Sequence, residues 1–284
     1  MKKYKLYNRF SRVALYTAII LLAFTMIYPL FWMISASFKS NLEIFTSIGL
    51  IPDEPIWTSY ADGWKATSNI TFTTFFINTF ILVIPTVVFT LISSYIVAYG
   101  FARYKFRGWK FFFSLMIGCL LLPKEVLIVP RYILFNRLGW LNTYLPFIVP
   151  AAFATYSFFI FLLIQYIRGI PLELDQSAKI DGANAANIML RILLPLCKPA
   201  LFSVTIFQFV WRWNEFFDPL IYINSVQKYP VALGLRMSIE LSGEAVAWNR
   251  VMAMAVLTML PPTIIYMVSQ KSFVEGINTT GIKG

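Results

Sequence analysis

Long stretches without charged residues dominate the chain. Four such stretches cover residues 13–38, 66–102, 138–167 and 251–270, and each exceeds the roughly 18 residues that suffice for a transmembrane helix. Two further segments reach this length only if charged residues lie inside them or at their edges. The pattern therefore predicts six helical spans, at about residues 13–37, 72–101, 109–130, 141–167, 199–223 and 249–270.

The composition agrees with a polytopic membrane protein and excludes most enzyme classes. Apolar residues make up 58% of the chain and charged residues only 13%, which a soluble domain does not show. The sequence has no histidine, so His-based metal sites and Ser-His or Cys-His nucleophile pairs are excluded. Cys119 and Cys197 fall in a span and in a loop, and we expect two free thiols.

The basic residues indicate topology. A net charge of +11 could suggest nucleic acid, but most Lys and Arg residues fall in alternate loops, namely the tail 1–12, residues 103–110, the loop 168–198 and the C-terminal tail. Positively charged loops stay in the cytoplasm, so both termini are predicted to be cytoplasmic, with lipid and not nucleic acid around the chain. No linker, repeat or low-complexity tract marks a second domain, and residues 13–284 are predicted to form a single transmembrane domain.

The cytoplasmic loop 168–198 predicts two short helices around a turn. Pro171 suits a first helical position, and Glu173 and Asp175 lie in the first turn, where the helix dipole favours acidic groups. Asp181-Gly182 can end this helix and offers a possible N-cap for the next one. We expect the first helix at about residues 172–180.

One face of this helix carries small residues beside a polar face. Leu174, Ala178 and Ser177 form a narrow ridge suited to insertion into a groove on a partner protein. The alternative is an amphipathic connector that rests on the membrane surface. Composition alone leaves both open.

The same residues carry a family resemblance. Gln176-Ser177-Ala178, Asp181-Gly182-Ala183, Ile192, Leu194-Pro195 and Lys198-Pro199 resemble the EAA loop of the membrane subunits of ABC importers. Within that group the chain is most similar to carbohydrate permeases related to the smaller permease of the maltose transporter. Gln176 and Ser177 stand where this family commonly has Glu and Ala. The resemblance continues over nearly the whole chain, through Tyr28-Pro29-Leu30, Ser37-Phe38-Lys39, Pro123, Ile128, Pro130, Leu138-Gly139, Asn142-Thr143, Trp213-Asn214, Phe216, Gly276 and Gly281–Gly284.

The resemblance implies an all-α, type I ABC importer transmembrane fold with its core at about residues 72–270. The chain would form half of the pore for a sugar or oligosaccharide in the bacterial cytoplasmic membrane. Its partners would be a second homologous permease, two ABC ATPase subunits or a homodimer of one, and an extracytoplasmic solute-binding protein. The helix 172–180 would be the coupling helix, and the implied ATPase-coupling residues are Glu173, Gln176, Ser177, Ala178, Asp181, Gly182, Lys283 and Gly284.

The chain itself lacks an ATPase motif. No G-x-x-x-x-G-K-[ST] phosphate loop occurs, so we expect no cofactor in this chain, with ATP and Mg²⁺ bound by the partner ATPase. Residues 241–244 read Leu-Ser-Gly-Glu and superficially resemble an ABC ATPase signature. They fall in a predicted outer loop and lack a second glycine, so we interpret the match as coincidence.

The fifth span carries polar groups at a depth where they are costly. Ionisable residues near the membrane midplane suggest a function, and Arg212, Trp213, Asn214 and Glu215 are predicted to line the substrate path. Trp213 could stack on a sugar ring, Asn214 could donate and accept, and Glu215 or Asp218 could accept from hydroxyls. Alternatively, Arg212 and Glu215 could pair with each other across one helical turn. The arginine weakly favours an acidic sugar, and the sequence leaves neutral and acidic solutes open.

Lys124 and Glu125 follow Pro123 in the third span and join the predicted path residues. They can interrupt the span inside the membrane, as in transporters with discontinuous helices, or lie at the outer interface. An ion-coupled secondary carrier built on Lys124, Glu125, Arg212 and Glu215 is the main alternative function. An intramembrane hydrolase would need a nucleophile and base, and the sequence offers no convincing pair.

Overall fold

The computed structural model describes residues 2–66, 70–240 and 246–278, with side chains described for residues 12–66, 70–240 and 246–269. The described residues are helical and contain no strand. Helices long and apolar enough to cross a membrane are Arg12–Ala36, Phe72–Arg103, Leu145–Gly169 and Trp248–Ser269. Two bent helix pairs raise the possible number of spans from 4 to 6.

The chain divides into two compact units, although its sequence carries no linker. One unit comprises residues 1–71 and 235–259, and the other comprises residues 72–234 and 260–284. The first contains α1 (Lys2–Ala36), α2 (Asn41–Thr46), α3 (Thr58–Trp64) and parts of α14 (Val231–Glu240) and α15 (Trp248–Asn278).

In the first unit, α1 is apolar on all sides. Residues 12–34 contain no buried side chain, and Phe24 and Met26 are 64% and 70% exposed. A helix that is hydrophobic all round suits a lipid environment, in which its backbone groups bond within the helix. This agrees with the first predicted span.

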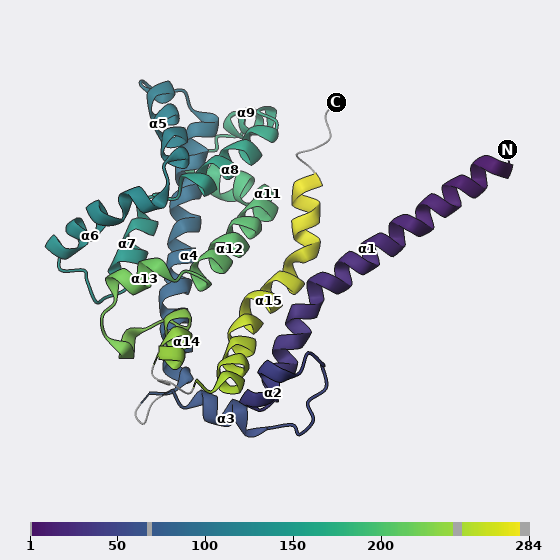
Figure 1. The fold of residues 1–284 in the computed structure, drawn as a ribbon. Helices are drawn as coiled ribbons and strands as arrows, with labels where there is room; N and C mark the ends of the chain where they lie inside the picture. Colours follow the sequence, from purple (N-terminus) through teal and green to yellow (C-terminus); the bar gives the residue numbers. More distant parts are fainter. Residues whose placement is uncertain (1, 67–69, 241–245, 279–284) are drawn as a thin grey trace. The chain divides into compact units, whose positions relative to one another are not determined.

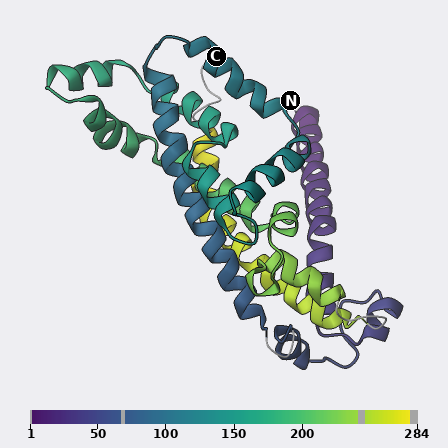
Figure 2. The ribbon, with the colours of Figure 1, turned by 90° about the vertical axis from the view of Figure 1, so that its left-hand side faces the viewer.

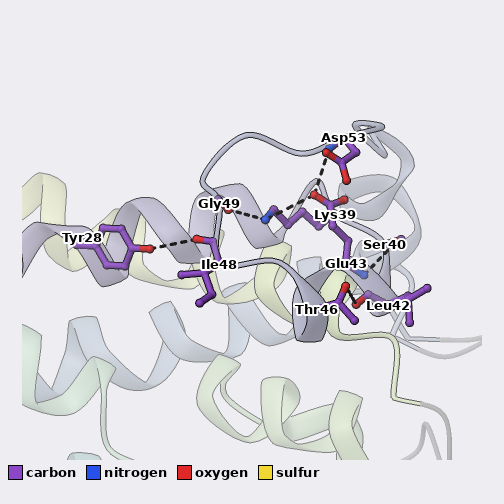
Figure 3. A network of polar contacts seen from close by, with 9 residues as sticks. All are labelled: Tyr28, Lys39, Ser40, Leu42, Glu43, Thr46, Ile48, Gly49 and Asp53. Atoms are coloured by element: carbon purple, nitrogen blue, oxygen red, sulfur yellow. Dashed lines mark hydrogen bonds and ion pairs between the residues drawn. The ribbon is translucent and has the colours of Figure 1, made fainter.

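A buried ion pair organises the loop that follows α1 (Figure 3). Lys39 Nζ lies 3.5 Å from Glu43 Oε1 and donates to the Gly49 carbonyl at 2.5 Å. Glu43 Oε1 in turn accepts from the Asp53 amide at 3.1 Å. Because both charged groups are buried and bonded to backbone, they hold residues 47–53 against α2.

The second unit is built around α4 (Phe72–Arg103), which packs against α7 (Leu145–Ala152), α8 (Ser157–Gly169) and α12 (Lys198–Trp213) (Figure 1). Phe159, Leu163 and Ile167 of α8 are fully buried in this core. Between apolar helices in lipid, close packing and hydrogen bonds supply the attraction. Gln208 of α12 provides one such bond by donating to Thr90 Oγ1 of α4 at 3.1 Å, inside the core.

Three predicted spans are interrupted in the structure. The third ends its first helix α5 (Trp109–Leu121) where Leu122 turns extended before Pro123, because a residue that precedes proline disfavours helical angles. It continues through η1 (Lys124–Leu127) into α6 (Ile128–Arg137), bent by 102° from α5. Helical geometry is therefore interrupted within the predicted span 109–130, at Lys124 and Glu125, where the sequence left an interruption open.

The fourth and fifth predicted spans contain breaks as well. The fourth begins at Leu145 rather than near 141, and residues 153–156 separate α7 from α8, with Ala154 at φ 56°. The fifth leaves helical geometry after Trp213 and resumes as α13 (Phe217–Tyr222), followed by η3 (Val226–Lys228). The breaks in the fourth and fifth predicted spans both border the same arginine, Arg212.

Candidate functional site

The predicted coupling helix is present as α9, Glu173–Ile180. Pro171 lies two residues before its first residue rather than at the first helical position, and Glu173 and Asp175 occupy its first turn. Its end is a Schellman motif, in which the Ala183 amide bonds the Ala178 carbonyl at 2.9 Å and the Gly182 amide bonds the Lys179 carbonyl at 3.0 Å. Gly182 has φ 84°, which explains the glycine at this turn.

The helix after the turn starts differently from the prediction. Asn184, not Asp181, is the N-cap of α10 (Ala185–Asn187), because its side-chain oxygen accepts from the Asn187 amide at 2.8 Å. Asp181 instead caps the end of α9. The chain then passes through one π-helical stretch, η2 (Ile188–Leu193), and α11 (Leu194–Leu196) into α12.

The inner face of α9 is fastened to the end of α4. Arg103 Nε lies 2.9 Å from Asp175 Oδ2, with both side chains at least nine-tenths buried. Arg103 Nη2 also donates to the Ile170 carbonyl at 3.1 Å. Ala178, 7% exposed, packs into the core of this unit beside Asp175.

Arg103 belongs to a row of three side chains that hold the loop. Tyr95, Tyr99 and Arg103 follow one another at four-residue spacing, which places them on one face of α4. Tyr95 Oη donates to the Met189 carbonyl at 2.7 Å, and Tyr99 Oη donates to the Ala185 carbonyl at 3.2 Å. This row was not predicted from the sequence, although polar groups at helical spacing near the end of an apolar span are a signal for it.

The outer face of α9 has no partner among the described residues. Glu173, Gln176, Ser177 and Ile180 are exposed, and their spacing places them on one side of the helix. Ile180 is 87% exposed. Of the predicted coupling residues, Ala178 lies on the opposite, inner face, and Lys283 and Gly284 lie outside the described residues, as do residues 241–245.

A second arginine ties α9 to its surroundings from the N-terminal side. Arg168, near the end of α8, places its Cζ 5.3 Å from the Trp109 ring centre and 5.5 Å from that of Phe113. These two rings stack at 5.0 Å on α5. Since α9 follows within a few residues, α5 and α4 both hold the segment that leads into it. The helices that come next along the chain project beyond the C-terminal end of α4 (Figure 2).

The predicted path residue Arg212 lies where the two helix breaks meet. It is 8% exposed, and its Nη2 donates to the hydroxyl of Tyr156, in the break between α7 and α8. Nη1 is 4.0 Å from Asp218 Oδ2 on α13, and the guanidinium lies 5.5 Å from the Phe147 ring centre. The alternative pairing with Glu215 was wrong, because α12 ends at Trp213 and the nearby carboxylate is that of Asp218.

The neighbours of Arg212 differ in exposure. Trp213 is 1% exposed and its ring packs on Phe80 and Phe209 at 5.1 and 5.4 Å, so aromatic side chains of this chain occupy the face predicted for a sugar. Asn214 is exposed and donates to the Val210 carbonyl at 3.0 Å. Glu215 is half-buried. The polar groups that a solute could reach in this segment are therefore those of Asn214 and Glu215, which follow Trp213.

Lys124 and Glu125 are exposed in η1 and form no side-chain hydrogen bond or ion pair within the described part of the chain. Among the described residues, Arg212 thus contacts Asp218 and Tyr156, and neither Lys124 nor Glu125 is bonded to this cluster. Cys119 and Cys197 are free thiols, as expected. Among the described residues, no group of three or more Cys, Asp or Glu side chains could hold a metal ion.

Sequence comparison identifies the family. Residues 66–279 match the binding-protein-dependent transport system inner membrane component family, and the chain belongs to this family. It is therefore a membrane-embedded permease subunit, and the resemblance drawn from residues 176–183 is confirmed. The membership disfavours the ion-coupled carrier and the intramembrane hydrolase.

Characterised relatives cover nearly the whole chain. The arabinooligosaccharides transport system permease protein AraQ of Halalkalibacterium halodurans is 33% identical over 264 residues, 93% of each protein. The sn-glycerol-3-phosphate transport system permease protein UgpE of Pectobacterium atrosepticum is 29% identical over 272 residues, 94% of this chain and 95% of that one. A crystal structure of a bacterial ABC transporter involved in the import of the acidic polysaccharide alginate contains a chain with the same fold, with a TM-score of 0.81 at 24% identity. That likeness covers 93% of this chain and 97% of the other.

Proposed function

We propose that this chain forms one half of the translocation pathway for a sugar or oligosaccharide in a bacterial ABC importer. The family membership supports the transport role, and the names of the relatives support the substrate class. One relative is named for arabinooligosaccharides and another for sn-glycerol-3-phosphate, so the names leave the charge of the solute open. A second permease, a pair of ABC ATPase subunits that bind ATP and Mg²⁺, and an extracytoplasmic solute-binding protein complete the importer.

The coupling part of this proposal rests on the difference between the two faces of α9. The inner face is held by Arg103 through Asp175, while the outer face leaves Gln176, Ser177 and Ile180 exposed. Ile180, which is 87% exposed, and the small Ser177 give this face an apolar group and room for close approach, which suit a partner. The partner is the cleft of the ATPase subunit, and small side chains such as Ser177 allow close approach.

A movement of α9 can be transmitted to the membrane-spanning helices through α4. Because the loop is bonded to Tyr95, Tyr99 and Arg103, a displacement of α9 moves the end of α4 with it. Helix α4 packs against α7, α8 and α12, the helices that border Arg212. Arg212, Asn214 and Glu215 line the path, and the exposed Lys124 and Glu125 form a further polar element of it.

A bulky substitution on α9 tests the coupling. Ser177→Trp adds a ring to the outer face, where it would prevent docking, whereas Ala186→Trp adds the same ring to an exposed position of the same loop outside α9. We expect Ser177→Trp to lose ATPase co-purification in mild detergent and to lower sugar uptake about tenfold or more, the effect of an interface residue at a tight contact.

The control decides the interpretation. Ala186→Trp is expected to retain both the ATPase and uptake. Equal ATPase recovery with wild type, Ser177→Trp and Ala186→Trp would contradict docking through this face. Recovery of the chain without any ATPase, together with uptake driven by an ion gradient alone, would contradict the importer itself.

A further inference from the structure

The loop between α2 and α3 folds back onto α1 (Figure 3). The Tyr28 hydroxyl donates to the Ile48 carbonyl at 3.2 Å, although Tyr28 lies well before the end of α1 at Ala36. At about 1.5 Å per residue, Tyr28 lies roughly 12 Å before the end of the helix. Ile48 is therefore held beside the interior of a helix that is long and apolar enough to cross a membrane.

The depth of Tyr28 in the membrane follows from the charges of α1. Arg12 is the last charged residue before the uncharged stretch 13–38, so it marks the membrane boundary nearest to the N-terminus. A hydrocarbon layer of about 30 Å takes roughly 20 helical residues to cross, which places the opposite boundary near residue 32. A tilted helix reaches this boundary later along the chain. Tyr28 and the Ile48 carbonyl bonded to it therefore lie at the opposite boundary or slightly inside it.

Side chains of the same unit also bond other backbone groups of this loop. The Gly49 carbonyl accepts from Lys39 Nζ at 2.5 Å, and the Asp53 amide donates to Glu43 Oε1 at 3.1 Å. Lys39 and Glu43 are buried and lie 3.5 Å apart, so together they add no net charge. Irregular backbone close to the hydrocarbon needs such partners, because water is scarce there. These bonds thus fit a loop at the edge of a membrane.

The tip of the loop, residues 47–51, presents apolar side chains. It carries no charge, and Ile48 and Ile51 are each 84% exposed. Trp57, near the other end of the loop, is also exposed and packs against Phe38 just beyond α1, with ring centres 4.9 Å apart. Tryptophan is common at the membrane–water interface. The tip thus continues the exposed apolar surface of α1.

We propose that the tip is a hydrophobic anchor in the lipid headgroup layer near the C-terminal end of α1, with the Ile48 and Ile51 side chains among the acyl chains. Lipid is the occupant because the tip lies beside a helix that is itself apolar and exposed, at the depth of the membrane boundary. At this depth, headgroups and interfacial water reach the remaining backbone groups of the tip, which hydrocarbon alone would not satisfy. The inference goes beyond the proposed function, since it depends on neither the solute nor the ATPase.

The charges of the loop predict that acyl chains, and not lipid charge, hold the tip. Asp53 and Glu54 follow the tip and are exposed, whereas Lys39 is paired with Glu43. The two exposed carboxylates remain at the headgroup level, since a charge in hydrocarbon is costly. They repel anionic headgroups, so anionic lipid should not strengthen the insertion.

Spin labels that collide with oxygen or with a water-soluble nickel chelate test the anchor. Ile51→Cys, Glu54→Cys and Phe24→Cys are labelled singly in the assembled importer, in a background with Cys119→Ser and Cys197→Ala. The exposed Phe24 on α1 is the reference for lipid, and the exposed Glu54 is the reference for water. In phosphatidylcholine vesicles without binding protein, we expect the Ile51 label about 5–10 Å below the phosphates and the Glu54 label in contact with the nickel chelate.

Two tyrosines of α1 provide a matched pair of variants. Tyr28→Phe removes the bond to the Ile48 carbonyl and should reduce the depth of the Ile51 label to below about 5 Å. Tyr16→Phe removes an exposed hydroxyl from the same helix, nearer its N-terminus, and should leave the depth unchanged. Replacement of phosphatidylcholine by phosphatidylglycerol should also leave it unchanged.

Four results would overturn the anchor. An Ile51 label that meets the nickel chelate as readily as the Glu54 label would place the tip in water. A label shielded from both oxygen and nickel would show that protein, such as the second permease, covers the tip. Insertion that requires phosphatidylglycerol would assign the contact to lipid charge. An unchanged depth in Tyr28→Phe would show that the bond to Ile48 does not hold the tip in the membrane.

Discussion

Two buried arginines at different places in the second unit show how the same residue type serves two purposes. Arg103 lies 2.9 Å from a carboxylate that is 9% exposed and bonds a backbone carbonyl as well. Arg212 lies 4.0 Å from a carboxylate that is 23% exposed and donates to the Tyr156 hydroxyl. The first pair is in close contact and buried on both sides, whereas in the second the charged groups lie further apart and the carboxylate is partly exposed. The distance to the carboxylate and its exposure thus distinguish a structural arginine from a candidate binding arginine.

Removal of Arg103 is expected to have the largest effect on stability. Arg103→Met leaves Asp175 buried without a counter-charge, which typically costs about 3 kcal/mol of unfolding free energy. The double variant Arg103→Met with Asp175→Leu should recover at least half of this loss, because two apolar groups need no charge partner. Unfolding of the purified chain in detergent measures both. A double variant as unstable as the single one would show that the ion pair is not the cause.

Removal of Arg212 should affect transport more than stability, in contrast to removal of Arg103. Arg212→Met is expected to cost at most about 1 kcal/mol of stability, since its Asp218 partner is distant and partly exposed to polar surroundings. Uptake should nevertheless fall about tenfold or more, because the variant loses donors to the solute. The same unfolding assay and radiolabelled uptake check this. A loss of stability equal to that of Arg103→Met, with normal uptake, would remove the distinction.

The turn after α9 gives a smaller, local effect. Asn184→Ala removes the observed N-cap and should cost about 1 kcal/mol, whereas Asp181→Ala should cost less because Asp181 makes no side-chain cap. Helix stability in this loop can be followed by hydrogen exchange of the Asn187 amide, which donates to the Asn184 side-chain oxygen. Faster exchange in Asp181→Ala than in Asn184→Ala would restore the cap predicted from the sequence.

The cation–π contact of Arg168 should have the smallest effect. Arg168 is exposed, so its position over Trp109 and Phe113 is expected to contribute about 0.5 kcal/mol. Arg168→Gln should lower stability by this amount and change the emission of Trp109. Arg107→Gln, which removes an exposed charge nearby with no ring contact, is the control. Equal unfolding free energies for the two variants would show that the contact of Arg168 with the two rings does not stabilise the protein.

The sequence predicted what depends on local pattern. Uncharged length marked the helices, because a bilayer demands about 20 apolar residues whatever the neighbours are. The α9 helix and its turn were predictable because their signals are also local. Acidic residues in the first turn and a glycine after the last turn act within a few residues of chain. The family was readable from residues 176–183 and was confirmed by comparison.

The tertiary structure decided what depends on contacts between distant residues. Arg103 meets Asp175 and Arg212 meets Asp218 only because α4 runs beside α8 and α12 and because α12 ends at Trp213. Burial of Trp213 and the inward position of Ala178 likewise depend on which helix faces pack, which the spacing of apolar residues alone does not specify in an apolar chain. In a membrane protein nearly every face is hydrophobic, so polar contacts between helices, rather than apolar periodicity, decide which side chains are enclosed and which remain free to bind.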